Sequence, residues 1–366
     1  MKKRFSKILL SFILLPSFAY SADLELFSSV DLFSYSDANI HEDDWLTLGP
    51  YQPGEVSFIY STAEVGFKWR NWKLSGISRF DYWTEFNEET GELLYLKGNS
   101  YTPEQDRMYN LDITANHIRA HGIKLAYEWL PFEDRNFVTS FAVSYFNADQ
   151  LIDGQINGQA KEVSEDRYQG DLYIDFDATE DLIFQGLEAE AQGGGRGVTL
   201  DFGLQWHIDQ IADITLNVTD LFSEIKWNDV QYSDYRANPR PAEIVDGKLY
   251  TYATIEGNRG HGDYQQTLPR RIELQGRYLL FRHLHLLAEI NHFEPVTIPR
   301  LGISLSFTPN THMDFYHSSF TGANEVAFYS KYLWLSIQAD KSIEGAEALD
   351  KLLTAGVKIG FSISLY

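Results

Sequence analysis

The chain has 366 residues, a formal net charge of −22 at pH 7 and no cysteine, and 15% of its residues are aromatic. The lack of cysteine excludes disulfides, thiolate metal sites and cysteine nucleophiles, and an acidic surface of this strength argues against nucleic acid as a partner. High charge together with many aromatic residues is expected of a transmembrane β-barrel with aromatic girdles and polar loops.

Residues 1–21 have the pattern of a secretory signal peptide. A basic start with Lys2, Lys3 and Arg4 precedes an apolar run over 8–15, and small residues suit cleavage after Ser21. The apolar run is shorter than the ~20 residues of a membrane-spanning helix. We therefore expect an exported protein, with residues 22–366 forming one domain in a bacterial outer membrane and outer-membrane lipid as its surroundings.

Strict alternation of apolar and polar residues recurs along the rest of the chain. Residues 22–36 read as a strand, and the clearest alternating segments are 123–129, 199–208, 272–280, 301–307 and 357–365. Successive side chains of a strand point to opposite faces, so each segment has one apolar and one polar face. The segments are about ten residues long, as tilted spanning strands require. Their mid-strand charges suit a polar lumen better than the outer face of a soluble sandwich.

The connections between these segments are of two lengths. Short turns are expected at 70–71, 209–210, 281–282 and 309–310, and long polar loops at 37–56, 85–107, 149–166 and 234–266. Short periplasmic turns that alternate with long extracellular loops are typical of outer-membrane barrels. The prediction is an all-β, antiparallel transmembrane barrel of about 14–16 strands. The division of 108–130 and of 311–341 into strands stays open, and the glycines of 193–197 are interpreted as a flexible turn.

Charged residues on the polar faces are candidates for the lining of the lumen. The set comprises Lys124, Glu128, Asp171, Asp175, Asp201, Glu273, Arg277 and Glu289, with Asp112, Lys226 and Lys358 as further members. Two interpretations are equally open. The charges set the selectivity of a pore, or they brace a filled interior.

A second candidate site is His317 with Ser319, two residues apart on an expected strand over 311–320. A His-x-Ser pair on a barrel wall resembles outer-membrane phospholipase A and the lipid A deacylase. In those enzymes the histidine deprotonates the serine for attack on an acyl ester. Asn324 or Glu325 would orient the histidine, while Phe320 after the serine departs from the phospholipase motif. The alternative is a chance occurrence of the pair.

Clustered histidines form a third candidate site. His283 and His285 share a face and could chelate a metal with Glu289, with His292 near them, and His117 and His121 form a separate pair. The alternative is that these rings only add polarity to the girdle or the lumen. We predict neither a metal nor an organic cofactor.

Residues 212–227, an alternating strand that runs into Asp-Leu-Phe and then Lys-Trp, resemble barrels of the FadL, TraF-like and PorV-like kind. This resemblance implies about 14 strands with a lateral exit or a plug, and it carries over no site residue. The leading hypothesis is a barrel for solute passage, or for docking in a surface export or adhesion assembly.

Two further hypotheses concern function. One is a lipid-ester hydrolase that uses His317 and Ser319. The other is a structural anchor for an envelope or secretion partner protein, held through the loop 234–266. The candidate contacts in that loop are residue types enriched at binding hot spots, namely Tyr250, Tyr252, Arg259 and Tyr264.

Overall fold

The structure is a computed structural model. It describes residues 24–38, 53–98, 101–104, 107–132, 136–164, 167–179, 194–209, 211–237, 242–245, 248–251, 255–340 and 354–365. The predicted signal peptide and its cleavage site lie outside these residues. No helix in the described part of the chain has the length and the apolar character needed to cross a bilayer.

Fourteen of the described strands close into one antiparallel ring, since β1 pairs with β18 along its whole length. They are β1 (Leu24–Ser36), β2 (Val56–Trp69), β3 (Trp72–Phe86), β4 (Tyr109–Trp129), β5 (Phe137–Ser164), β7 (Gly194–Ile208), β8 (Ala212–Ala237), β12 (Arg271–Phe281), β13 (Leu284–Phe293), β14 (Val296–Thr308), β15 (Thr311–His317), β16 (Asn324–Tyr329), β17 (Leu333–Ala339) and β18 (Thr354–Leu365). The predicted barrel, its strand number and the strand at 22–36 are confirmed. Residues 108–130 form one strand, and 311–341 contain three.

The outer surface of the ring is an apolar belt. On β14, Leu301 and Phe307 are 66% and 58% exposed, whereas Ser304 on the other face is completely buried. Four tryptophans lie at the ends of strands beside the short turns and are also exposed, namely Trp69, Trp72, Trp129 and Trp206. An apolar outer band bordered by aromatic rings is the arrangement of a barrel surrounded by lipid.

The short turns lie at the same end of the barrel as both chain ends. Leu24 is opposite Trp69 on β2 and also opposite Leu365 on β18, so the β2–β3 turn and both ends of the described chain lie at this end. Arg70 and Asp209 have positive φ angles of 54° and 46°, as tight hairpin turns require. The predicted turns at 70–71 and 309–310 are thus confirmed, and the one after β12 lies at 282–283 because Phe281 still pairs with Leu284. Of the turn predicted at 209–210, residue 210 lies outside the described residues.

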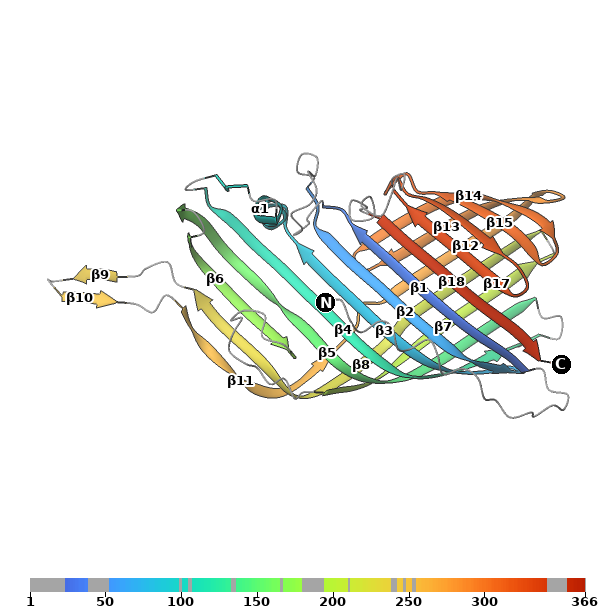
Figure 1. The fold of residues 1–366 in the computed structure, drawn as a ribbon, viewed down its shortest axis with the longest axis horizontal. Coiled ribbons are helices and arrows are strands. Elements are labelled where there is room, and N and C mark those ends of the chain that lie inside the picture. Colours follow the sequence, from blue (N-terminus) through green and yellow to red (C-terminus); the bar gives the residue numbers. More distant parts are fainter. Residues whose placement is uncertain are drawn as a thin grey trace, which may run out of the picture.

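One side of the barrel is much taller than the other (Figure 1). β4, β5 and β8 have 21, 28 and 26 residues, whereas β15 has seven. Two further strands, β6 (Arg167–Ala178) and β11 (Ile255–Gln266), continue this tall side beyond the ring, where β6 lies between β5 and β8 and β11 pairs only with β8. We call the tall part formed by β4, β5, β6, β8 and β11 the wall extension.

The wall extension corrects two predicted loops. Most of 149–166 and much of 234–266 are strand, although both segments are rich in polar residues. They lack the regular apolar alternation by which the spanning strands were predicted, and only single apolar residues in them, such as Leu151, are buried. Two smaller elements lie near the extension, the hairpin of β9 (Ala242–Val245) with β10 (Lys248–Thr251) and the helix α1 (Glu88–Gly98).

Strand β8 bends at the point where the strands that pair with it change. At Asp220, which has a φ angle of 57°, the pairing with β7 shifts register between Leu200 and Phe202. Odd-numbered residues face the interior both before this shift, as Asn217 does, and after it, as Trp227 does, but beyond the bend the inward face is the apolar one. Lys226 therefore lies on the outer face, where its ammonium group is 2.9 Å from Glu224, so its expected place in the lumen was wrong.

Candidate functional site in the lumen

Two neighbouring cavities occupy the interior of the ring. The first, of about 580 Å³, opens at the end with the short turns, where Lys68 and Glu128 form an ion pair at 2.7 Å. The second, of about 270 Å³, lies in the middle of the barrel, and we call it the central cavity. Asn217 on β8 lines both cavities and therefore lies between them.

A group of aromatic rings closes the lumen beyond the central cavity. The ring centroid of Phe293 on β13 lies 5.2 Å from that of Phe33, 4.8 Å from Phe58 and 5.6 Å from Tyr60. In the sheet order β13 lies opposite β2, with six strands between them in either direction, so these contacts cross the barrel. Trp83 stacks on Phe58 at 5.4 Å. We call these five residues the aromatic closure.

Below the rings, a buried ion pair also crosses the lumen. Both terminal nitrogens of Arg79 on β3 donate to the carboxylate of Asp220 on β8, at 2.8 and 2.5 Å, and Arg79 also donates to Asp81. Asp201 accepts from the backbone N–H of Asp220 at 3.0 Å and from Lys124 at 2.7 Å. The bend in β8 is therefore fixed to three other strands by charge-assisted hydrogen bonds.

The opposite wall carries a second charged group. Arg300 on β14 donates to Glu289 and Glu325, and to Gln338 at 3.0 Å. Glu273 on β12 lies in the central cavity with Lys358, Asp31 and Arg300. Nearly all of these charges have an opposite charge beside them, as buried charges must.

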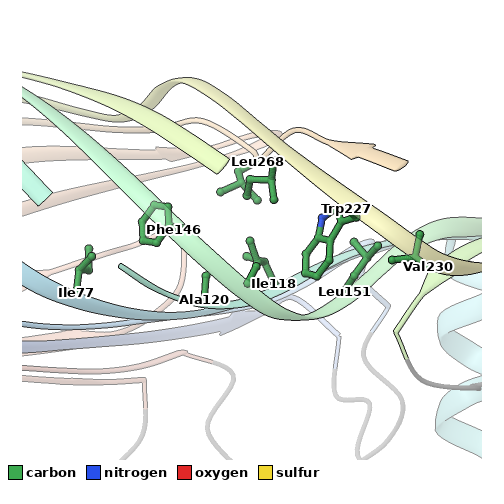
Figure 2. Close-up of a cluster of buried hydrophobic side chains, with 10 residues drawn as sticks. Ile77, Ile118, Ala120, Phe146, Leu151, Trp227, Val230 and Leu268 are labelled. Atoms are coloured by element: carbon green, nitrogen blue, oxygen red, sulfur yellow. The ribbon is translucent and has the colours of Figure 1, made fainter. Parts of the chain in front are cut away.

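An apolar cluster fills the lumen on the side of the wall extension. Figure 2 shows that Trp227 and Val230 of β8 lie near Ile118 of β4 and Leu151 of β5, with Leu268 close by. Gln266 on β11 is completely buried and links β8 to β4 beside this cluster. It accepts from the Trp227 indole at 3.1 Å and donates to the carbonyl of His117 at 3.1 Å.

Glycines make room for this cluster, which corrects one interpretation of the sequence. Gly194 to Gly197 belong to β7 and do not form a flexible turn. A Cβ atom on Gly195 would lie 2.7 Å from the Trp227 ring, and one on Gly197 would lie 2.4 Å from the Ile225 side chain. The absence of side chains at these positions lets the Trp227 ring rest directly on the neighbouring strand.

The structure places the predicted lumen residues in two regions. Within the ring lie Lys124, Glu128, Asp201, Glu273, Arg277 and Glu289, with Arg277 donating to Ser306 at 3.1 Å. Asp171 and Asp175 lie on β6 of the wall extension, above the ring. There the exposed carboxylate of Asp171 accepts from Arg236 at 3.0 Å.

The sequence analysis missed several lumen residues. Arg79, Arg300 and Tyr60 lie on the inward face of strands whose outward neighbours are apolar, such as Phe80 and Leu301. The same alternation could therefore have found them. Asp220 could not be found in this way because it lies at the bend.

The His317 and Ser319 pair lies on the outer wall, beside an apolar groove of about 600 Å³ that both residues line. His317 Nδ1 is 3.0 Å from Oδ1 of Asn324, whereas Glu325 points inward and pairs with Arg300. The strand expected over 311–320 was too long, because β15 ends at His317 and Ser319 already belongs to the turn. The turn begins where buried Ser318 donates to the carbonyl of Pro299, at 2.9 Å.

The clustered histidines are not brought together as a metal site. His285 lies beside Arg277 at 3.3 Å, and Glu289 is engaged by Arg300. No group of three or more His, Cys, Asp or Glu side chains within the described ranges is arranged to hold a metal ion.

The predicted loop contacts are spread over several places. Tyr250 belongs to β10, and Tyr252 lies outside the described residues. Arg259 on β11 donates to Gln231 at 2.7 Å. Tyr264 faces inward and packs against the apolar cluster of Figure 2.

A closed antiparallel ring with an apolar belt, an aromatic girdle and a polar interior defines a transmembrane β-barrel of the bacterial outer-membrane type. No family model matches the chain, and no curated protein matches it either. Similar solved structures include the Pseudomonas putida toluene transporter TodX, with 10% identity over 95% of this chain and 91% of that chain and a TM-score of 0.41. A Pseudomonas aeruginosa FadL homologue has 9% identity over 93% of this chain and 89% of that chain, with a TM-score of 0.37.

A third similar structure is the translocator domain of the autotransporter NalP from Neisseria meningitidis. It has 9% identity over 95% of this chain and 89% of that chain, with a TM-score of 0.33. FadL-like barrels, which residues 212–227 resemble, are thus among the structures to which this chain is similar. The assignment as a 14-strand barrel is carried by the strand pairing of the chain itself.

Proposed function

We propose that the protein is a gated passage for small solutes and that the structure represents its closed state. The observation that carries the proposal is the aromatic closure. The two neighbouring cavities on either side of Asn217 are followed by rings that belong to the barrel strands themselves. Side chains change rotamer within picoseconds to nanoseconds when exposed, and more slowly when packed. A small rearrangement of Phe293 would therefore extend these cavities.

Conductance in a planar lipid bilayer tests this proposal. We expect the wild-type protein to conduct weakly and Phe293→Ala to conduct several times more, because truncation removes the ring that contacts the opposite wall. Phe307→Ala, which truncates an exposed ring on the lipid face of β14, is the matched control and should behave as wild type. Absence of conductance from all three proteins at every voltage would contradict passage.

A second candidate function is hydrolysis of a lipid ester at the outer wall. The observation that favours it is the His317–Asn324 contact, which holds one imidazole nitrogen and leaves Nε2 available beside the groove. In such a reaction Nε2 takes the proton of Ser319 Oγ as the oxygen attacks the ester carbonyl. The histidine then returns the proton to the departing alcohol, and water releases the acid from the acyl-enzyme.

Acyl release from phospholipid in mixed micelles tests this candidate. Release by wild type that is abolished in Ser319→Ala and in His317→Ala, and reduced in Asn324→Ala, would support it. Equal release by wild type and Ser319→Ala would exclude Ser319 as the nucleophile. Thr321→Ala, which changes a neighbouring residue of the same turn, is the control.

A third candidate is docking of an envelope or secretion partner on the wall extension. The observation in its favour is that β11 pairs on one side only within the described part of the chain. Such an edge presents free backbone groups to another strand. Purification from outer membranes should recover the partner with wild type and lose it when residues 238–262, which include most of β11, are replaced by a short glycine-serine linker. Unchanged recovery would exclude this segment as the contact.

A further inference from the structure

Most charges around the central cavity have an opposite charge beside them. Arg79 is paired with Asp81 and Asp220, Lys124 with Asp201, and Arg300 with Glu289 and Glu325. Two further basic groups also lie near an acid, and Glu273 shares the cavity with Lys358 and Arg300. Arg271 Nη2 is 3.9 Å from Asp220, and Lys358 Nζ is 3.8 Å from Asp31. A cavity of this kind offers an ion of either sign little net attraction, because the ion must compete with a partner already in place.

Some buried polar atoms that line this cavity nevertheless lack a hydrogen bond. Tyr60 is only 4% exposed, and its hydroxyl has no partner within the described residues. The same holds for Nε of Arg271, whose guanidinium lies over the Tyr60 ring at 4.6 Å, and for Nε of Arg300. Buried polar groups in native structures are nearly always bonded, to protein, water or ligand. These atoms therefore mark a place where a polar solute can bind.

The other side chains of the cavity add acceptors, donors and flat apolar surface. Amide and hydroxyl groups are contributed by Thr62, Asn217 and Asn291, and the rings of Phe33 and Phe293 form part of the wall toward the aromatic closure. A volume of about 270 Å³ has room for one ring-sized molecule. A purely apolar solute would leave the polar atoms unpaired and would displace their water without replacing its hydrogen bonds.

From these observations we propose that the central cavity is a binding site for a small neutral polyhydroxylated solute of the size of a hexose. Its hydroxyl groups both donate and accept, so they match walls that carry both donors and acceptors. Its C–H faces pack against Phe33 and Phe293, and Tyr60 and Arg271 donate to its oxygen atoms. This inference rests on the proposed passage, for which it names the class of solute.

Isothermal titration calorimetry on the purified full barrel, in a detergent without a sugar head group, tests the site. The probes are D-glucose, sodium acetate, choline chloride and toluene. We expect saturable binding of glucose alone, and an affinity about 3–10-fold lower in Tyr60→Phe, the loss of one hydrogen bond. Tyr60→Phe removes only a hydroxyl without a partner and keeps the ring, so the barrel should fold as wild type.

Tyr278→Phe is the matched control, because this tyrosine is 52% exposed on the outer wall. Glucose affinity that is equal in Tyr60→Phe and wild type, absence of glucose binding, or saturable binding of acetate, choline or toluene instead would overturn the site. Calorimetry does not require conduction. Glucose binding without conductance in Phe293→Ala would therefore remove the passage alone, and conductance without glucose binding would remove this site alone.

Discussion

Arg79 and Asp220 are 141 residues apart in sequence, yet two hydrogen bonds of 2.8 and 2.5 Å join them across the lumen. The Arg79 side chain is 4% exposed and that of Asp220 is completely buried. Three strands, β4, β5 and β7, separate their own strands in the sheet order. The pair therefore ties the bend of β8 to the wall that faces it.

Removal of one partner should destabilise the barrel strongly. In Arg79→Met the Asp220 carboxylate keeps its burial but loses its main partner, which typically costs about 3–5 kcal/mol. Arg119→Met is the comparison. Arg119 and Asp149 are about half exposed, and pairs of that kind contribute about 1 kcal/mol or less. Equilibrium unfolding in urea, in lipid vesicles, measures both, and equal losses would contradict the structural role of the buried pair.

The packing of Trp227 on Gly195 gives a second prediction. Gly195→Ala places a methyl group 2.7 Å from an indole ring that its hydrogen bond to Gln266 holds in place. We expect a loss of about 1–3 kcal/mol, the usual range for overpacking. In Gly76→Ala, by contrast, the nearest heavy atom is 3.9 Å away. The same urea titration should show that this control is close to neutral, and a neutral Gly195→Ala would contradict the close contact.

The lipid-facing side of β18 gives a third prediction. Ile359 lies in the middle of the strand and is 43% exposed. Arginine at such a position should cost about 2–4 kcal/mol, because the charge faces the bilayer midplane. Ser362→Arg changes a residue of the lumen face and should cost much less. Folding yields into phospholipid vesicles, followed by the heat-dependent gel shift of barrels, would show the difference, and similar yields would place Ile359 away from lipid.

The absence of native cysteine permits a direct test of topology. Thr321 lies in the turn between β15 and β16, and Asn310 lies in the short turn after β14 at the other end of the barrel. A membrane-impermeant maleimide applied to intact cells should label Thr321→Cys. It should label Asn310→Cys only after the outer membrane is permeabilised. The reverse pattern would invert the orientation.

The sequence predicted the ring well because a bilayer imposes a simple rule. Where lipid lies on one side and a polar lumen on the other, residues such as Leu301 and Ser304 must alternate in character, and they do. The prediction failed where that rule is absent. The second half of β5 and all of β11 are rich in polar residues and lack the regular alternation, so they were interpreted as loops.

Two other features could not be predicted from the alternation of apolar and polar residues. Beyond Asp220 the inward face of β8 is apolar and its outward face carries the charges, the reverse of the membrane-spanning part, so Lys226 was placed on the wrong face. Contacts across the lumen, such as Phe293 with Phe58, depend on ring closure, and no local spacing encodes them. Strand faces could therefore be predicted from the sequence, but the partners that meet inside the barrel could not.

The unequal strand lengths also set how far the rim of the barrel rises on each side of its mouth. At about 3.3 Å per residue, β5 extends for roughly 90 Å and β15 for only about 23 Å along their own directions. A tilted strand needs about 9–11 residues to cross the bilayer. The rim at β15 and β16 therefore lies close to the membrane surface, while the opposite rim rises far above it. The mouth of the barrel is therefore lowest, and closest to the membrane surface, on the side of β15 and β16.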